Sequence, residues 1–396
     1  MGKSRRPVAA LTLAALMLAS CGGDGGTLGS GPVTVTPTPS PTPTPTPNCA
    51  LASRQAFAKA VIDEWYLFPS DVASANPGAY SDVQSYIDAL VAPARALNKD
   101  RFFTYITSIA EENAFFESGS SAGFGVLMAY DAVNQRIVIA EAYEGAPAFA
   151  AGIDRGTAIV GIGTNSGNVR TVASIVAAEG TQGLTDALGP NDPGVSRVLR
   201  ITDAAGTRDV TVAKADYALD PVSDRYGAKI ISEGGRSYGY LNLRTFIASA
   251  DDQLTAAFAD FRAQGVTDII IDFRYNGGGL VSTANLMGDL MGAGRAGQLF
   301  SQTRFRPSKS VEDEEHRFAP GAQSIAPTRI AFIGTGSTAS ASELVINSML
   351  PYLGANMTLV GSNTYGKPVG QIALDKAECD DRMRIVPFAT GNASGQ

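Results

Sequence analysis

Residues 237–361 alternate between apolar runs of strand length and amphipathic helical patterns, and this alternation constrains the fold more than any other feature of the chain. We expect strands at 237–246, 268–274, 329–335 and 357–361, separated by helices at 250–264, 280–291 and 340–350. A repeated strand–helix order is typical of a mainly parallel sheet. Functional groups of such a sheet lie at the carboxyl ends of its strands.

Two loops at those strand ends carry residues suited to acyl transfer. One reads Arg-Tyr-Asn-Gly-Gly-Gly at 274–279, and the other reads Gly-Ser-Thr-Ala-Ser-Ala-Ser-Glu at 336–343. Ser340 lies where a strand gives way to a helix, so the N–H of Ala341 and the helix dipole point toward developing negative charge. A second N–H donor could come from the glycine turn at 277–279. Ser340 is the candidate nucleophile, although Ser-Ala-Ser-Glu is also a capping box at a helix start.

The chain contains a single histidine, which limits the choice of catalytic base. His316 lies in the charged stretch Glu-Asp-Glu-Glu-His-Arg, which is typical of a solvated loop. A lysine can act as the base when burial lowers its pKa enough to leave the amine neutral. We therefore expect Lys367 to take the proton of Ser340. Gln371 would leave the same face of an expected strand and orient the amine, and His316 is the rival base.

Composition excludes several other classes of function. One imidazole cannot build a zinc site that needs several, so no metal or cofactor is expected. The net charge of −7 provides no basic surface for nucleic acid. Residues 361–367 begin like a phosphate-binding loop, but Pro368 replaces the required hydroxyl residue and 369–374 alternate like a strand. Nucleotide is therefore not an expected partner.

Residues 119–217 differ in character, with short β-type runs between glycine-containing turns. Three of their segments resemble a PDZ domain of the type found in bacterial proteases, namely Gly123-Phe124-Gly125-Val126, Gly145-Ala146-Pro147-Ala148 and Ala151-Gly152-Ile153. The resemblance implies that the backbone N–H groups of the first segment bind a terminal carboxylate. The neighbouring strand edge would pair with the rest of the peptide.

The first residues predict export and anchoring. Residues 1–20 have the positively charged start and short apolar run of a secretory signal. The sequence Leu-Ala-Ser-Cys-Gly at 18–22 resembles a bacterial lipobox, which implies a lipid on Cys21 and a membrane-anchored protein of the bacterial cell envelope. Gly22 favours the outer membrane, with the protein facing the periplasm. Residues 21–48, rich in Gly and then in Thr-Pro repeats, are expected to form an extended tether.

The chain after the tether divides into three parts by composition. Residues 49–118 show apolar residues at helical spacing and predict a helical N-terminal domain. Residues 119–217 form the β-rich, PDZ-like part, and 218–396 form the α/β core. Two cysteines remain once Cys21 is assigned to lipid. In an oxidising compartment Cys49 and Cys379 could pair, or either could stay free.

The segments around the candidate residues resemble the carboxyl-terminal processing, or tail-specific, serine proteases. Residues 272–279 match that family's D-x-R-x-N-x-G-G pattern. Residues 338–343 match its S-A-S-A-S-E pattern, with Thr338 at the first position. Residues 365–371 match its Y/F-G-K-G-x-x-Q pattern, with Pro368 in place of the second glycine.

The resemblance implies a multidomain serine peptidase with a helical cap, a PDZ-like domain and a crotonase/ClpP-like α/β core. In it Ser340 would be the nucleophile, Lys367 the base and Gln371 its orienting residue. The backbone N–H groups of Gly278 and Ala341 would form the oxyanion hole. Its partners would be proteins or peptides with free C-termini, cleaved near those ends. A different class of function also fits the sequence, a lipoprotein that binds peptides through an inactive protease-like fold.

Overall fold

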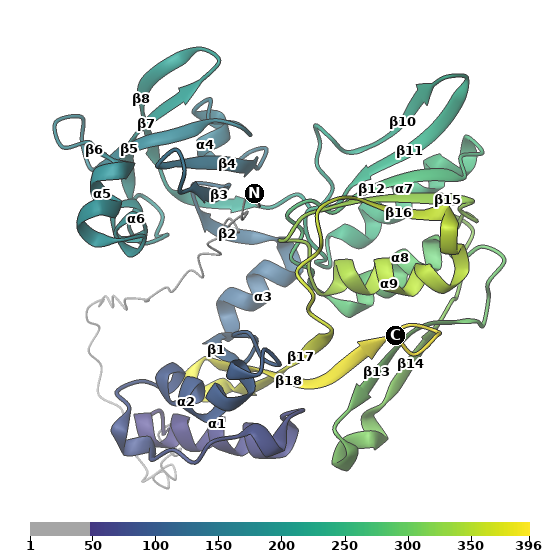
Figure 1. Ribbon diagram of the computed structural model, residues 1–396, viewed down its shortest axis with the longest axis horizontal. Helices are drawn as coiled ribbons and strands as arrows, with labels where there is room; N and C mark the ends of the chain where they lie inside the picture. Colours follow the sequence, from purple (N-terminus) through teal and green to yellow (C-terminus); the bar gives the residue numbers. More distant parts are fainter. Residues whose placement is uncertain (1–47) are drawn as a thin grey trace, which may run out of the picture.

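The apolar runs of residues 237–361 form one sheet in the computed structural model, which describes residues 48–396 (Figure 1). The strand order is β10 (Ala228–Glu233), β11 (Arg236–Asn242), β12 (Asp268–Asp272), β15 (Arg329–Gly334) and β16 (Met357–Gly361). The first two strands pair antiparallel and the rest pair parallel. The expected mainly parallel α/β sheet is therefore confirmed.

Three helices connect these strands and cover one face of the sheet (Figure 1). They are α7 (Ala250–Ala263), α8 (Val281–Leu290) and α9 (Ala341–Leu353). Alternate residues of β12, Ile269 and Ile271, are buried against Phe258 and Phe261 of α7 in one hydrophobic cluster. Burial of this face fixes the register of the sheet, so the loops at its carboxyl edge are held by a packed core.

Residues 119–218 form a second part with its own hydrophobic cluster. Its main sheet is antiparallel and contains β3 (Val126–Asp131), β4 (Arg136–Ala142), β5 (Ala158–Gly163), β7 (Ser196–Asp203) and β8 (Gly206–Ala213), with β6 (Arg170–Thr171) beside β5. The helices are α4 (Pro147–Ala150), α5 (Val172–Glu179) and α6 (Gln182–Leu188). A two-stranded ribbon of β2 (Ser120–Gly123) and β9 (Ala215–Ala218) joins this part to the rest. β3 is an edge strand, paired only with β4.

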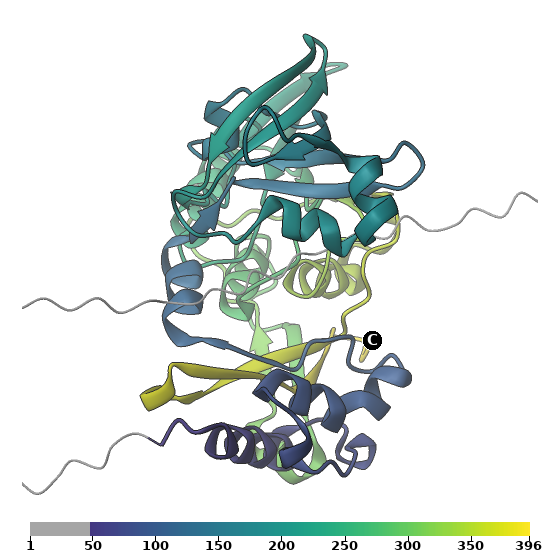
Figure 2. The same cartoon turned by 90° about the vertical axis from the view of Figure 1, so that its left-hand side faces the viewer.

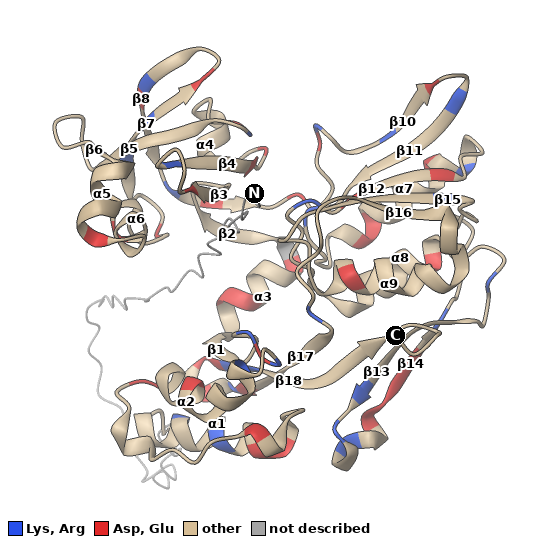
Figure 3. Cartoon of the chain, in the orientation of Figure 1, with Lys and Arg blue, Asp and Glu red and all other residues tan. Residues whose placement is uncertain are grey.

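The third part combines the two ends of the described chain (Figures 1 and 2). The N-terminal helices α1 (Leu51–Trp65) and α2 (Val83–Ala96) pack on an antiparallel sheet of β1 (Tyr105–Ser108), β18 (Asp381–Gly391), β13 (Leu299–Phe305), β14 (Glu314–Arg317) and β17 (Val369–Lys376). The helix α3 (Ile109–Ser118) leads from this sheet toward the β-rich part. Basic and acidic residues face each other along the β13–β14 hairpin, as in the Arg304–Glu315 pair at 2.9 Å (Figure 3).

This third part differs from the expected division of the chain. The sequence placed residues 218–396 in one core and the N-terminal helices in a separate cap. In the structure β17 and β18 leave the core, and Met383 and Ile385 are completely buried in the cluster formed with α1 and α2. Two helices alone could not bury their apolar faces, so the C-terminal strands supply the missing surface.

A disulfide joins Cys49 to Cys379, with 5.5 Å between their Cα atoms. It ties the start of α1 to the turn between β17 and β18. No helix within residues 48–396 has the length and apolar character needed to span a bilayer. The predicted signal sequence, the predicted lipidation site Cys21 and all but the last residue of the expected tether lie outside the described residues.

Candidate active site

A cavity of about 760 Å³ lies where the three parts meet, and it holds the predicted catalytic residues. The core contributes Ser340 and the loop at 277–279, and the β17 region contributes Lys367 and Gln371. Phe115 and Phe116 of α3 line another wall. The structure therefore brings together residues that the sequence could associate only by their chemistry.

Ser340 is held in a strained backbone conformation at the start of α9. Its φ of 55° and ψ of −116° lie outside the regions that L-residues favour. Six non-glycine residues in the described chain have positive φ, and two of them, Ser340 and Tyr275, line this cavity. The N–H of Ala341 belongs to the first helical turn, and no residue of 48–396 accepts a hydrogen bond from it. This N–H is available to a developing oxyanion.

Gly278 lies directly against the nucleophile segment. A Cβ added to it would lie 2.7 Å from Ser340 Cβ and 2.8 Å from the Ala341 nitrogen, and its φ is +105°. Only glycine fits this position. Its N–H donates to Asn276 Oδ1 at 2.9 Å, and Asn276 is completely buried. Of the two predicted oxyanion donors, Ala341 therefore has a free N–H in this structure, and Gly278 would have to release Asn276 first.

Lys367 has the surroundings that a lysine base requires. Its Nζ donates to Gln371 Oε1 at 2.5 Å and lies 4.6 Å from the centroid of the Phe103 ring. Gln371 Nε2 in turn donates to the backbone oxygen of Phe103 at 2.5 Å, which fixes the amide. Burial lowers the pKa of Lys367 to about 8, an effect opposed by the negative charges of Asp100 and Glu343. In this structure Lys367 Nζ does not form a hydrogen bond with Ser340 Oγ.

Glu343 connects the nucleophile to the base. Its carboxylate accepts hydrogen bonds from the backbone N–H groups of Ser340 at 2.9 Å, Gly366 at 2.5 Å and Lys367 at 2.8 Å. The sequence indicated the first of these as part of a capping box. It missed the other two, because they join segments more than twenty residues apart. One carboxylate thus holds the turn of Ser340 against the loop of Lys367.

A turn near the N-terminus supports that loop from its other side. The guanidinium of Arg101 donates to the backbone oxygens of Tyr365 and Gly366 and lies 4.2 Å from the centroid of the Tyr365 ring. Asp100 shapes the turn by accepting from the N–H of Phe103 at 2.8 Å. No local pattern in the sequence identified these residues.

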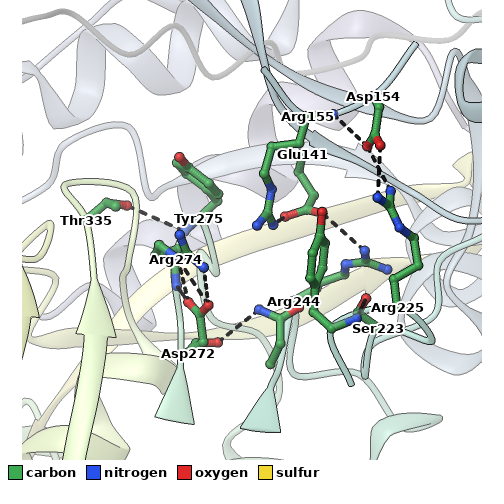
Figure 4. Close-up of polar contacts among 12 residues, drawn as sticks. Glu141, Asp154, Arg155, Ser223, Arg225, Arg244, Asp272, Arg274, Tyr275 and Thr335 are labelled. Carbon is green, nitrogen blue, oxygen red and sulfur yellow. Dashed lines mark hydrogen bonds and ion pairs between the residues drawn. The ribbon is translucent and has the colours of Figure 1, made fainter. Parts of the chain in front are cut away.

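The loop at 274–279 is held by a buried carboxylate (Figure 4). Asp272 is completely buried and accepts from the backbone N–H and the guanidinium of Arg274, with its nearest charged contact at 2.6 Å. Tyr240 donates its hydroxyl hydrogen to the same carboxylate at 2.8 Å. The Asp and Arg of the D-x-R pattern therefore shape the loop and do not enter the cavity.

A buried ion-pair cluster joins the β-rich part to the core (Figure 4). Arg244 pairs with Glu141 at 3.1 Å and also with Glu144, and its side chain is 3% exposed. Two residues further on, the N–H of Phe246 donates to the Gly278 oxygen at 2.9 Å. Arg244 itself lines the cavity. The cluster places the β-rich part directly beside the candidate oxyanion site.

The alternative base, His316, and the segment that resembled a phosphate-binding loop, residues 361–367, do not form the sites considered for them. His316 lies on β14, 3.0 Å from Asp289 Oδ1, and does not line the cavity. Residues 361–367 continue into strand β17, so they do not open a helix as a phosphate-binding loop would. Within residues 48–396 no group of three or more metal-ligating side chains of the His, Cys, Asp and Glu types is found.

The predicted peptide-binding residues line a second, smaller pocket of about 230 Å³. Gly123, Phe124, Gly125 and Val126 line it together with Leu188 of α6. A Cβ at Gly125 would come within 2.0 Å of the Ala146 Cβ, which explains the glycine. Both pockets are lined by Ser121, Val126 and Tyr217, so they adjoin each other.

Known proteins are similar to this chain in sequence and in fold. Residues 237–382 match the model of the family described as Peptidase family S41. The chain is 25% identical over 254 residues to a carboxyl-terminal-processing protease of Picosynechococcus sp., an alignment that covers 63% of this chain and 55% of that protein. It is also 25% identical over 276 residues to a chloroplastic C-terminal processing peptidase of Tetradesmus obliquus, covering 66% and 54%. The chain thus spans about half the length of these curated relatives.

Solved structures extend the likeness to most of the described residues. A crystal structure of a Bacteroides fragilis protein assigned to the S41 proteases superposes with a TM-score of 0.65 at 25% identity, covering 86% of each chain. The photosystem II D1 C-terminal processing protease has the same fold, with a TM-score of 0.53 at 17% identity over 87% of this chain and 89% of that one. The described fold is therefore similar to that of solved S41 proteases. Residues 237–382 are thus similar to peptidase family S41.

Proposed function

We propose that this protein is a serine endopeptidase that cleaves exported proteins or peptides near their C-termini. The observation that supports this proposal most directly is the environment of Lys367. Lys367 lines the same cavity as Ser340, its amine donates a hydrogen bond to Gln371, and burial lowers its pKa to about 8. A lysine placed in this way is a general base suited to mildly alkaline pH. The single histidine of the chain lies outside the cavity.

The proposed reaction has two halves with balanced proton transfers. Neutral Lys367 takes the proton of Ser340 Oγ as the oxygen attacks the scissile carbonyl carbon, and the N–H of Ala341 stabilises the oxyanion. Collapse breaks the C–N bond, and Lys367 gives its proton to the leaving amine. Lys367 then takes a proton from water, which attacks the acyl-enzyme. The second intermediate releases Ser340, and the proton returns to its Oγ.

The adjoining pockets support the choice of chain ends as substrates. An extended peptide could pair with the free edge of β3 and place its terminal carboxylate at residues 123–126. Phe124, Met128 and Leu188 make the walls of this pocket apolar, which favours an apolar last side chain. The shared lining residues would let the preceding chain continue into the cavity of Ser340.

The proposed setting is the bacterial cell envelope, with Cys21 lipidated and the protein anchored at the outer membrane facing the periplasm. The disulfide between Cys49 and Cys379 supports an oxidising compartment. Finding an unmodified Cys21 by mass spectrometry of membrane-extracted protein would refute the anchor and leave the peptidase proposal standing.

Cleavage of a peptide library by the purified protein tests the activity. We expect wild type to cut peptides with apolar C-termini and Ser340→Ala to be inactive while retaining peptide binding. Ser337→Ala is the matched control, because Ser337 lies in the same turn without lining the cavity. If folded wild type binds these peptides and cuts none, the protein is a peptide-binding member with an inactive site, and the proposal fails.

A further inference from the structure

One edge of the core sheet is an exposed strand without charged residues. β16 pairs only with β15 among the described strands, so the backbone groups on its other side are open to a further strand. Its last four residues are exposed. Residues 344–366, which include β16 and most of α9, contain no Asp, Glu, Lys, Arg or His (Figure 3). No longer run of this kind occurs in residues 48–396.

Three other edge strands show how such an edge is usually protected. A free edge is a template for pairing with another chain, and charged side chains, proline or bulges block it in most proteins. β10, at the opposite edge of the same sheet, carries Lys229 and Glu233. β14 reads Glu-Glu-His-Arg, and β8 carries Arg208 and Asp209. β16 has neither charge nor proline, and its pairing with β15 is continuous, without a bulge.

A groove beside this edge continues the apolar layer between the sheet and α9. Its volume is about 380 Å³, and it is lined by Leu344 and Leu350 of α9 and by Met357 and Leu359 of β16. Met357 packs against the core cluster, so Leu359, two residues further on, lies on the same helix-covered face. A strand added to β16 would place its own alternate side chains in this groove. The core layer would then extend by one strand.

Exposed apolar side chains gather on this surface. Eight large apolar residues are exposed within residues 48–396, and four of them are Leu350, Leu359, Val360 and Tyr365. A patch of this kind marks a surface that binds a partner.

The absence of charge restricts the kind of partner. Segments that bind anionic lipid carry Lys or Arg, and residues 344–366 contain neither. A second copy of the chain is the better match, because an uncharged patch meets its own copy without bringing like charges together. This matters for a chain with a net charge of −7.

The order of residues in β16 fits a two-fold copy of itself. In an antiparallel pair centred on the middle residue, Leu359 faces Leu359 of the second copy. Thr358 then lies opposite Val360, and both are β-branched residues that favour strands. Met357 lies opposite Gly361, which has no side chain and leaves room for the methionine.

We propose that β16 is the centre of a dimer interface in which the core sheets of two copies join antiparallel across a two-fold axis. Such pairing is closed, because the same edge of each copy is used and neither remains open. The groove is also lined by Glu343 and Lys367, so the second copy would lie against the loop that carries the candidate base. The proposal does not depend on the proposed peptidase activity.

The mass of the full chain in solution tests the proposal. Every variant also carries Cys21→Ser, so that a lipid cannot drive association. Sedimentation equilibrium from about 1 to about 100 μM should show twice the monomer mass at the upper end. Leu359→Lys and Leu359→Glu should each raise the dissociation constant by about a hundredfold or more, because each variant places two like charges face to face. An equal mixture of these two variants should form dimers again, since a lysine then faces a glutamate.

A matched control lies on the opposite edge of the same sheet. Ser232 is an exposed residue of β10, and Ser232→Lys should remain dimeric like wild type.

Cross-linking gives a second readout that does not depend on charge. Directly opposite residues of an antiparallel pair have Cβ atoms about 5 Å apart. A short thiol-specific cross-linker should therefore join two copies of Leu359→Cys and leave Ser232→Cys unlinked. This measurement decides the matter if the charged variants do not fold.

Several results would overturn the proposal. Wild type that stays monomeric at about 100 μM would do so. A dimer that persists in both charged variants would place the interface elsewhere, and a mixture that stays monomeric would exclude two-fold pairing about Leu359. Monomers that bind phosphatidylglycerol vesicles, and lose this binding in Leu359→Glu, would make the patch a membrane surface instead. Cleavage dependent on Ser340 is measured separately, so either proposal can fail without the other.

Discussion

The pH dependence of cleavage should show directly whether Lys367 is the base. Only the neutral amine can accept the proton of Ser340, so activity must rise with pH as Lys367 loses its own proton. With a pKa of about 8, roughly one tenth of the lysine is neutral at pH 7 and roughly nine tenths at pH 9. We expect kcat/KM to rise about tenfold over this interval and then level off. If Lys367 had the ordinary pKa of a lysine, kcat/KM would instead rise about tenfold for each pH unit up to about pH 10.

Two charge substitutions should move this rise in opposite directions. Glu343 raises the pKa of Lys367 and Arg384 lowers it. Glu343→Gln should therefore move the midpoint to lower pH, and it should also reduce kcat, because one amide oxygen cannot accept all three N–H groups. Arg384→Gln should move the midpoint to higher pH. Movement of both midpoints in the same direction would refute the electrostatic account of this pKa.

The assay measures kcat/KM from pH 6 to 10.5 on a fluorogenic peptide with an amidated C-terminus, so that recognition of the chain end does not contribute. Lys367→Arg keeps the charge and cannot lose it, and should be inactive. His316→Ala should resemble wild type. A midpoint near the ordinary pKa of histidine, or near-wild-type activity of Lys367→Arg, would exclude Lys367 as the base.

Three further predictions concern the supports of the site and the chain ends. Gly278→Ala should abolish measurable cleavage because its Cβ would lie 2.7 Å from Ser340 Cβ, whereas Gly277→Ala, with no atom within 4 Å, should retain activity in the same assay. Arg101→Met should lower kcat about tenfold with little change in KM, since it frees the loop of the base without touching substrate. Cys379→Ser opens a loop of 330 residues and should lower the free energy of unfolding by about 5 kcal/mol in urea titrations, an effect that reduction of wild type should reproduce.

The sequence predicted the core sheet well because buried parallel strands read as nearly continuous apolar runs. The run expected at 268–274 contains the mostly buried β12 at Asp268–Asp272. The run at 357–361 coincides with β16, an edge strand whose last four residues are exposed, so its apolar run predicted the strand without being buried. β13, β14 and β18 gave no such signal. Their residues mix apolar side chains with charges such as Arg382 and Arg384, which pair with Glu112 on α3. Pairing of this kind is non-local, and a single sequence carries no record of it.

The candidate site could be predicted as far as its side chains carry chemistry. Ser340, Lys367 and Gln371 were predicted from residue type, from spacing and from the resemblance to carboxyl-terminal processing proteases, and the structure places them in one cavity. The groups that hold these three side chains and the neighbouring glycine turn in place could not be predicted in the same way. The acceptor that fixes Gln371 is the backbone oxygen of Phe103, which any residue would supply. The direction of the Gly278 N–H depends on the Asn276 side chain, a detail of turn geometry.

Burial lowers the pKa of two lysines, Lys367 in the large cavity and Lys214, which lines the smaller pocket. Their hydrogen-bond partners differ, and this difference suits them to different roles. Gln371 Oε1 is the one hydrogen-bond acceptor paired with Lys367 Nζ among the described residues, and Lys367 lines the same cavity as Ser340. Lys214 Nζ is engaged by three acceptors, which keep its charge in place and its nitrogen away from a reacting group. Lowered pKa alone therefore does not identify the base.

This difference predicts two distinct pH profiles for one enzyme. Because kcat/KM reports the free enzyme, cleavage of a free-acid peptide requires Lys367 neutral and is favoured by Lys214 protonated, both near pH 8. We expect a maximum near pH 8 for the free acid, falling at higher pH toward the values of the amidated peptide, which should rise and level off. Lys214→Met should convert the first profile into the second. Identical profiles for the two peptides in wild type would show that chain-end recognition does not depend on Lys214.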